Sequence, residues 1–448
     1  MPASKIGKNG NLIPNGDFSQ GGIGAVPDGW TVSVKRPSLA PQIKLAMKDG
    51  RKVLFLGPGK DDDCCGRIEA PVTLKGGATY RMHVRFRHSA DMNPQDTLLF
   101  CVQNAPGAPG FNNGIFHYRR VRDGLATGEG VFLVRPESQV PSSVRIYYRM
   151  HASAKAWVES ISLEPCDPVP PRPVKLAATM GNLTPVTRWA AVLDAAGKAG
   201  TDLILLPESI NGGNFETFAG PTCKLMSAKA RQYGMYVAGG MYYHDKKADR
   251  VYNTAVLFDR KGKRVFRYDK NHPYTPEILD MGVTSGDGAE VYRTDFGTIG
   301  IITCYDSWFS DVSKLLALRG AEVILFPNAG YYRSLMPARA ADDCVRFVTS
   351  PLGGDCGIWD TSGTDIEKPD VDPSCCPCHP PTYKQVRRRK IGKVVLLTAA
   401  MDLSKSPSPH NWGGPCMSAP GGRRNRAELK RSLYPAIQAE IERWWDND

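Results

Sequence analysis

Hydrophobic and polar residues alternate in the first third of the chain. In TYRMHVRFRHS, the residues Tyr80, Met82, Val84 and Phe86 alternate with charged or polar ones. A period of two is typical of a half-buried β-strand. The stretches DTLLFCVQN, GVFLVRP, SVRIYYRMH and AWVESISLEP are further candidate strands, separated by turns rich in Gly, Pro and Asn. We therefore expect residues 1–165 to form an all-β sandwich.

A proline-rich segment then interrupts the pattern. Residues 166–173, CDPVPPRP, contain four prolines. Such a stretch favours polyproline II and is typical of a semi-rigid linker. We take it as the boundary between two domains.

After residue 174 the apolar residues come in longer runs. LTPVTRWAAVLDAAGKAG (183–200) predicts a helix that Gly200 ends. VKLAAT, DLILLPE, YVAGGMYY, NTAVLFD, GIITC and AEVILFPN are apolar strands without polar alternation. Buried strands between helices indicate an α/β layered domain with both sheet faces covered. We assign residues 174–448 to this domain.

Charge and composition exclude several classes of partner. The net charge is +12, but the excess lies mainly in segments such as 384–390 and 421–431, which lack interleaved aromatic residues. We read them as solvated faces and expect no nucleic-acid partner. No apolar run approaches the roughly 18 residues of a membrane span, and we expect no membrane partner. The N-terminus lacks the apolar region of a signal peptide, which leaves localisation open.

The cysteines and glycines indicate no cofactor. Neither GxGxxG after the first strand nor GxxxxGK[ST] occurs, so nucleotide binding has no support. CCPCH (375–379) could supply zinc ligands, but no second pair stands at finger spacing. We therefore expect no metal site, and we leave open whether these cysteines form disulfides or stay free.

Three reactive residues fall at the ends of predicted strands of the second domain. Glu208 follows LILLP, Lys270 follows RVFRYD and Cys304 follows GIIT. Each has a structural alternative: a surface carboxylate, a lysine paired with Asp269, or a core thiol. Together they form a complete set for acyl transfer. The carboxylate can take the thiol proton, the thiolate can attack, and the ammonium can hold the oxyanion.

The motifs around these residues resemble the nitrilase, or carbon–nitrogen hydrolase, superfamily. LLPES, YDKNHPY and GIITCYDSWF resemble its glutamate, lysine and cysteine motifs, in the same order. The resemblance implies an αββα four-layer sandwich in a homodimer or larger assembly. It also implies Cys304 as nucleophile, Glu208 as general base and Lys270 as oxyanion stabiliser. Glu277, in PYTPEI, is the candidate for the second glutamate of such proteins.

The residues beside the cysteine indicate a branch of this superfamily. True nitrilases have Trp-Glu after the cysteine, whereas Tyr305-Asp306 is closer to amidases and carbamoylases. The resemblance therefore implies a small-molecule amide or N-carbamoyl substrate and release of ammonia. Nitrile hydrolysis and acyl transfer by the same triad are alternatives. Tyr305, Trp308 and Asn328 lie beside the motifs and are candidate substrate-binding residues.

The first domain resembles carbohydrate-binding-module or galactose-binding-like jelly rolls. It opens with NLIPNGDFSQGG and PDGW and closes with AWVESISLEP, as such modules often do. The resemblance implies a jelly-roll sandwich with a glycan as partner. A non-catalytic glycan-binding protein is therefore the alternative from another class. The tail after residue 402, rich in Gly, Pro and Ser, could cross a dimer interface or be a surface loop.

Overall fold

A computed structural model describes most of the chain. The described residues are 10–104, 113–115, 118–122, 124–134, 141–368, 383–404, 434–435 and 437–439. The predictions for the Cys-rich segment 375–379 and for most of the C-terminal tail fall outside these residues. The described chain forms two compact units, with the boundary between Pro168 and Val169.

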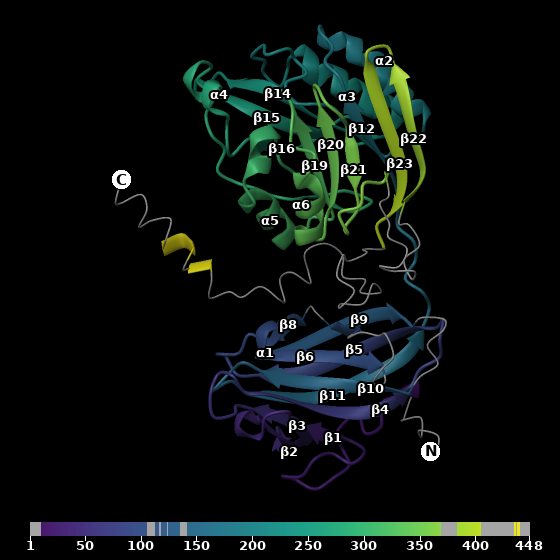
Figure 1. Cartoon of the computed structure of the whole chain (residues 1–448), viewed down its shortest axis with the longest axis vertical. Coiled ribbons are helices and arrows are strands. Elements are labelled where there is room, and N and C mark those ends of the chain that lie inside the picture. Colours follow the sequence, from purple (N-terminus) through teal and green to yellow (C-terminus); the bar gives the residue numbers. More distant parts are fainter. Residues whose placement is uncertain are drawn as a thin grey trace. The chain divides into compact units, whose positions relative to one another are not determined.

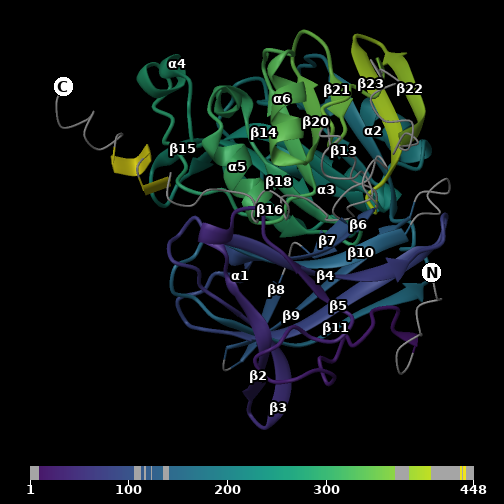
Figure 2. The ribbon, with the colours of Figure 1, turned by 60° about the horizontal axis from the view of Figure 1, so that its bottom comes forward.

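The N-terminal unit consists of two antiparallel sheets, visible in two views (Figure 1, Figure 2). The first has the strand order β1-β4-β10-β6-β7 and the second the order β2-β3-β11-β5-β9-β8. The elements are β1 (Thr31–Ser33), η2 (Pro37–Leu39), β2 (Gln42–Lys48), β3 (Arg51–Gly57), β4 (Cys65–Thr73), β5 (Thr79–His88), α1 (Pro94–Thr97), β6 (Leu98–Asn104), β7 (Asn113–Ile115), β8 (Tyr118–Arg122), β9 (Leu125–Leu133), β10 (Pro141–Arg149) and β11 (Ala156–Cys166).

Alternation along the strands places the core of this unit. In β5, Tyr80, Met82, Val84 and Phe86 are all buried in one cluster that includes residues of both sheets. The residues between them face away from this cluster, as the period of two requires. The prediction of an all-β region is confirmed, whereas the jelly-roll connectivity stays a prediction.

The C-terminal unit contains two mixed sheets with helices (Figure 1). The strand orders are β16-β15-β14-β13-β12-β23-β22 and β17-β18-β19-β20-β21. The elements are β12 (Pro173–Met180), η3 (Val186–Trp189), α2 (Ala190–Lys198), β13 (Leu203–Leu205), α3 (Pro221–Tyr233), β14 (Tyr236–Asp245), β15 (Arg250–Phe258), β16 (Arg264–Asp269), α4 (Thr275–Leu279), β17 (Tyr292–Arg293), β18 (Thr298–Ile301), η4 (Cys304–Trp308), α5 (Asp311–Leu318), β19 (Val323–Asn328), α6 (Leu335–Asp343), β20 (Arg346–Pro351), β21 (Gly357–Trp359), β22 (Tyr383–Ile391) and β23 (Val394–Asp402).

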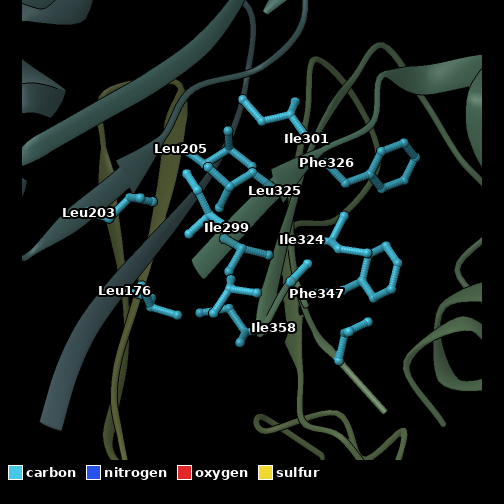
Figure 3. Packing of buried hydrophobic residues seen from close by; sticks show 14 of the residues in the cluster. Leu176, Leu203, Leu205, Ile299, Ile301, Ile324, Leu325, Phe326, Phe347 and Ile358 are labelled. Carbon is cyan, nitrogen blue, oxygen red and sulfur yellow. The ribbon is translucent and has the colours of Figure 1, made fainter. Parts of the chain in front are cut away.

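The two sheets pack face to face, and helices cover them. Leu176, Leu203 and Leu205 of one sheet share a buried cluster with residues of the other, such as Ile299 and Leu325 (Figure 3). The opposite face of the seven-stranded sheet packs against α2 and α3 in a separate cluster. Helices α5 and α6 pack on the five-stranded sheet. Strands covered on both faces explain the continuous apolar runs of the sequence.

The predicted helix at 183–200 forms over a shorter span. It begins as the 3-10 turn η3 and continues as α2. Gly200 follows its end with a φ of +67°, a conformation that favours glycine, as predicted. In the part of the chain that the structure describes, no helix is both long and apolar enough to cross a membrane.

Candidate active site

The three predicted residues meet where strands end. Glu208 follows β13, Lys270 follows β16, and Cys304 begins η4 after β18. The Nζ atom of Lys270 lies 3.1 Å from Oε1 of Glu208. The charges of both residues act on the thiol of Cys304. Glu208 and Lys270 follow strands of the seven-stranded sheet, and Cys304 follows a strand of the five-stranded sheet that packs against it. Strand ends from two packed sheets therefore bring together side chains that are distant in sequence.

A close backbone approach places Glu208. The amide of Gly240 in β14 donates to the carbonyl of Pro207 at 2.9 Å, and the carbonyl of Gly240 accepts from Ile210 at 3.0 Å. A Cβ atom at Gly240 would come within 2.7 Å of the Glu208 Cα atom. Only glycine allows this approach, so the GG of the sequence YVAGGMYY positions the glutamate backbone.

A second glutamate shares the lysine. Oε2 of Glu277, in α4, lies 2.6 Å from Nζ of Lys270. The same oxygen accepts the Tyr274 backbone amide at 2.7 Å, while Oε1 accepts the Tyr242 hydroxyl at 3.0 Å. Lys270 therefore bridges two carboxylates, and it does not pair with Asp269, the structural alternative weighed from the sequence.

Asn253 joins the same two carboxylates from β15. Its Nδ2 donates to Oε1 of Glu208 at 2.6 Å and to Oε1 of Glu277 at 2.5 Å. Its own backbone carbonyl accepts the amide of Lys270 at 2.9 Å. The four side chains form one buried hydrogen-bonded cluster, in which Lys270 is 1% and Glu208 3% exposed.

The cluster favours the charged forms of Lys270 and Glu277. Burial alone would lower the pKa of Lys270, but the charges of Glu208, Cys304 and Glu277 outweigh it and raise that pKa. Burial alone would raise the pKa of Glu277, but Lys270, Asn253 and the Tyr274 amide bring it below its ordinary value. A charged ammonium thus lies among carboxylates in a place with little water.

Cys304 is the partly exposed member of the group. Its φ is +43°, which a non-glycine residue seldom adopts, and its Sγ lies 3.8 Å from the Gly330 carbonyl. Burial first, and then the charge of Glu208, raise the pKa of the thiol to about 12, although Lys270 opposes them. The thiol is therefore protonated at neutral pH, and attack requires a base to remove its proton.

The turn after Cys304 is tied to the loop that carries the lysine. The buried carboxylate of Asp306 accepts the Thr303 amide at 2.8 Å and the Tyr268 hydroxyl at 2.7 Å. It also accepts the His272 amide at 2.9 Å and contacts the His272 ring at 3.1 Å. One carboxylate thus sets the cysteine turn relative to Lys270.

The predicted substrate-side residues lie in two environments. Tyr305 is half-buried and Trp308 is 50% exposed, with their rings 6.3 Å apart. Tyr332 packs edge-on against Trp308 at 4.8 Å. Asn328, by contrast, is fully buried at the end of β19, where its Nδ2 donates to the Phe326 carbonyl at 3.0 Å. Their roles in substrate binding stay predictions.

Sequence reasoning missed Asn253 and Tyr242. Both lie inside strands that we read only as apolar runs. Asn253 is a fully buried amide within NTAVLFD, and buried polar side chains need hydrogen-bond partners. This polar residue in a buried strand was the available signal for Asn253.

No metal centre is found among the described residues. Within them, no group of three or more His, Cys, Asp or Glu side chains could hold an ion. The described cysteines, including adjacent Cys64 and Cys65, form no disulfide with one another. The CCPCH segment lies outside the described residues.

Comparisons with known proteins identify the family of the C-terminal unit. The carbon–nitrogen hydrolase family profile matches residues 178–343. A nitrilase of Pyrococcus abyssi is 31% identical over 180 residues, which cover 37% of this chain and 67% of that protein. The omega-amidase NIT2 of Bos taurus is 25% identical over 187 residues, covering 37% and 67%.

Other matches cover different shares of their proteins. Nitrilase homolog 2 of Dictyostelium discoideum is 29% identical over 181 residues, and the match covers 35% of this chain but only 55% of that protein. The crystal structure of an amidase from Nesterenkonia sp. aligns with a TM-score of 0.42 and 17% identity, covering 59% of this chain and 96% of that one. Through its C-terminal unit, the chain belongs to the carbon–nitrogen hydrolase family, the nitrilase superfamily.

Proposed function

We propose that the C-terminal unit hydrolyses a non-peptide C–N bond in an amide or N-carbamoyl compound and releases ammonia. The observation that carries this proposal is the buried cluster of Glu208, Lys270 and Glu277 beside the thiol of Cys304. It combines a nucleophile, a base and a cation without histidine or metal. The amidases among the relatives support the choice of an amide.

The base in this mechanism is one particular oxygen. Oε2 of Glu208 is buried and has no hydrogen-bond partner in the described part of the chain, whereas Oε1 binds Lys270 and Asn253. We assign Oε2 to take the thiol proton while Sγ of Cys304 bonds to the carbonyl carbon. The negative charge that develops on the carbonyl oxygen is stabilised by the ammonium of Lys270.

Two further steps complete the cycle. The tetrahedral intermediate collapses, the C–N bond breaks, and the proton held by Glu208 passes to the leaving nitrogen, which departs as ammonia. A water molecule then attacks the thioester while Glu208 accepts one of its protons. Breaking of the C–S bond releases the acid, and Sγ regains its proton. Glu277 and Asn253 remain hydrogen-bonded to the cluster throughout.

Ammonia release tests the proposal. The full chain and Cys304→Ala are compared on primary amides, N-carbamoyl compounds and nitriles, with and without hydroxylamine as an acyl acceptor. We expect ammonia from an amide or carbamoyl compound, with a loss of at least about 10³-fold in Cys304→Ala. Turnover of nitriles alone, hydroxamate formed with hydroxylamine but no acid formed without it, or no turnover by the folded protein would each contradict the hydrolase proposal.

A cleft on the N-terminal unit favours a second, separate function. Its volume is about 490 Å³, and it is lined by polar side chains around Val53: Asp17, Ser19, Arg51, Lys52, Arg85, Glu159 and Ser160. Mixed hydroxyl, carboxylate and cationic groups suit the hydroxyls of a sugar. We therefore propose glycan binding here, tested by calorimetry of the full chain and of Arg51→Ala with neutral and uronic-acid oligosaccharides. Binding that Arg51→Ala leaves unchanged would contradict this site.

A further inference from the structure

The two carboxylates of the cluster need more hydrogen-bond donors than the lysine supplies. Two glutamates and one ammonium leave one negative charge in excess, within a buried region. Lys270 reaches one oxygen of each glutamate, Oε1 of Glu208 and Oε2 of Glu277. Unpaired carboxylate oxygens in such a place are costly, and they raise the carboxyl pKa.

Asn253 supplies the missing donors. Its amide group gives one hydrogen to Glu208 and the other to Glu277, at 2.6 and 2.5 Å. The opposite orientation of the amide would point its oxygen at two carboxylates, so the neighbours determine the orientation. A neutral side chain thereby holds two like charges in place without adding a charge.

The network has a consequence for the choice of base. Three of the four carboxylate oxygens have partners: Oε1 of Glu208 and both oxygens of Glu277, which also bind Tyr242 and the Tyr274 amide. Only Oε2 of Glu208 lacks one in the described part of the chain. The bonds at Oε1 therefore leave Oε2 as the oxygen that can take a proton.

We propose that Asn253 is a positioning residue that holds both carboxylates in place, keeps Glu277 ionised and directs Oε2 of Glu208 toward the thiol of Cys304. The kinetic part of this inference rests on the proposed function, whereas the part that concerns ionisation does not. The titratable groups around the pair are Lys270, Cys304 and Tyr242. Asn253 acts through the two carboxylates and forms no bond with the substrate in this scheme.

The test compares three variants of the full chain. Asn253→Ala removes both donors, and Asn253→Asp keeps the shape while adding a carboxylate. Asn211→Ala is the matched control, because Asn211 is equally buried and binds the backbone of Tyr242, but no carboxylate. Folding of each variant is checked by circular dichroism.

Two measurements give the result. Infrared difference spectra follow the carbonyl stretch of protonated carboxyl groups against pH. The Glu208→Gln and Glu277→Gln variants assign each band to its glutamate. The pH profile of kcat/KM follows the same ionisation during turnover. In Asn253→Ala we expect the midpoint of the infrared titration and the midpoint of the acid limb of kcat/KM each to move up by about one pH unit. We also expect kcat/KM to fall about 10²-fold. In Asn253→Asp we expect a larger upward shift, and in Asn211→Ala no shift.

The outcomes separate the two proposals. A shift of the infrared transition in a protein that releases no ammonia from any compound would leave the role of Asn253 in ionisation intact and overturn the proposed function. Unchanged titration and an unchanged acid limb in folded Asn253→Ala and Asn253→Asp would overturn the inference. An equal shift in Asn211→Ala would also overturn it, since the effect would then come from general loosening of the strand.

Discussion

Glu208 has two opposite effects on Cys304. Its negative charge raises the pKa of the thiol, which makes the resting protein less reactive. In the proposed mechanism the same carboxylate removes the thiol proton when a substrate carbonyl is in place. The thiolate would then exist only during attack. A protected thiol and an active nucleophile are therefore compatible in one site.

Replacing Glu208 should separate these two effects. In Glu208→Gln we expect the pKa of Cys304 to fall below about 12, because the nearby negative charge is gone. Turnover should nevertheless fall by about 10² to 10⁴, because the base is gone. Alkylation of Cys304 against pH, followed by mass spectrometry, gives the first quantity, and ammonia release gives the second.

Glu216→Gln is the control, since that carboxylate binds Thr222 outside the cluster. A thiol in Glu208→Gln that titrates at the same pH as in the unaltered chain would contradict the electrostatic argument.

At this scale, the residues with reactive groups could be predicted and their supporting residues could not. Glu208, Lys270 and Cys304 stand out because each follows a predicted strand. Asn253 lies in the middle of β15, and the face on which its side chain lies depends on the register with β14, where it pairs with Tyr242. Register comes from the packing of the whole sheet, which local sequence does not contain.

Among the elements, the turn η4 depends most clearly on one side chain. Asp306 binds the backbone at its start and the loop of His272, so the turn and the loop are held together. The His272 ring also contacts Asp311 at 3.3 Å, in the first turn of α5, and stacks on Phe309. The position of Cys304 therefore depends partly on an ionisable ring.

The pH dependence of this contact follows from its direction. The hydrogen bond to Asp306 raises the pKa of His272 above the ordinary 6.5; burial opposes the change and Asp311 reinforces it. The folded state therefore holds the proton more tightly than the unfolded state. The stabilisation is complete below about pH 6.5 and is lost as the pH rises through the folded pKa.

His272→Gln should make the stability of the folded protein less dependent on pH. We expect the difference in Tm between pH 6 and pH 9 to shrink by roughly 2–4 °C, for a contact of about 1 kcal/mol. Scanning calorimetry measures it, with His244→Gln as control, since His244 pairs only with the exposed Asp249. The same pH dependence in His272→Gln as in the unaltered chain would rule out this contribution.

Most strands could be predicted, but their assembly into sheets could not. Alternation in β5 and the apolar run of β19 each indicated a strand and its degree of burial. The antiparallel addition of β23 beside β12 joins residues more than 200 positions apart. Such pairings depend on tertiary packing, and local patterns carry no information on them.

At the scale of the whole molecule, the candidate site belongs to one unit. Its residues come from β13 to η4 and from the loops between them, all within residues 169–422. Arg172 anchors the start of this unit: its backbone amide donates to Asp402 at 2.9 Å, and its side chain donates to Glu322 and to the Leu403 carbonyl. The prolines before Arg172 lie outside this anchor.

Cleavage before Arg172 should therefore leave the chemistry intact. A protease site inserted between Asp167 and Pro171 would detach the first 167 residues or so from the C-terminal unit without touching the anchor. We expect the C-terminal fragment to keep ammonia release within about twofold and its own unfolding transition. Activity that disappears on cleavage, while the fragment remains folded by circular dichroism, would show that the N-terminal unit contributes to catalysis.

The left-handed backbone of Cys304 affects the heat resistance of the whole protein. A side chain at positive φ costs roughly 1–2 kcal/mol, and glycine avoids this cost. We expect Cys304→Gly to melt a few degrees above Cys304→Ala, since both lack the thiol and only glycine relaxes the backbone. Equal melting temperatures would argue against strain at this position.

The backbone at this position favours glycine, whereas the proposed chemistry requires cysteine. A search for heat-stable variants that ignored turnover would then discard the proposed nucleophile first. Selection for thermostability in this protein therefore needs an activity screen beside it, because a more stable and inactive variant is one codon change away from the native sequence.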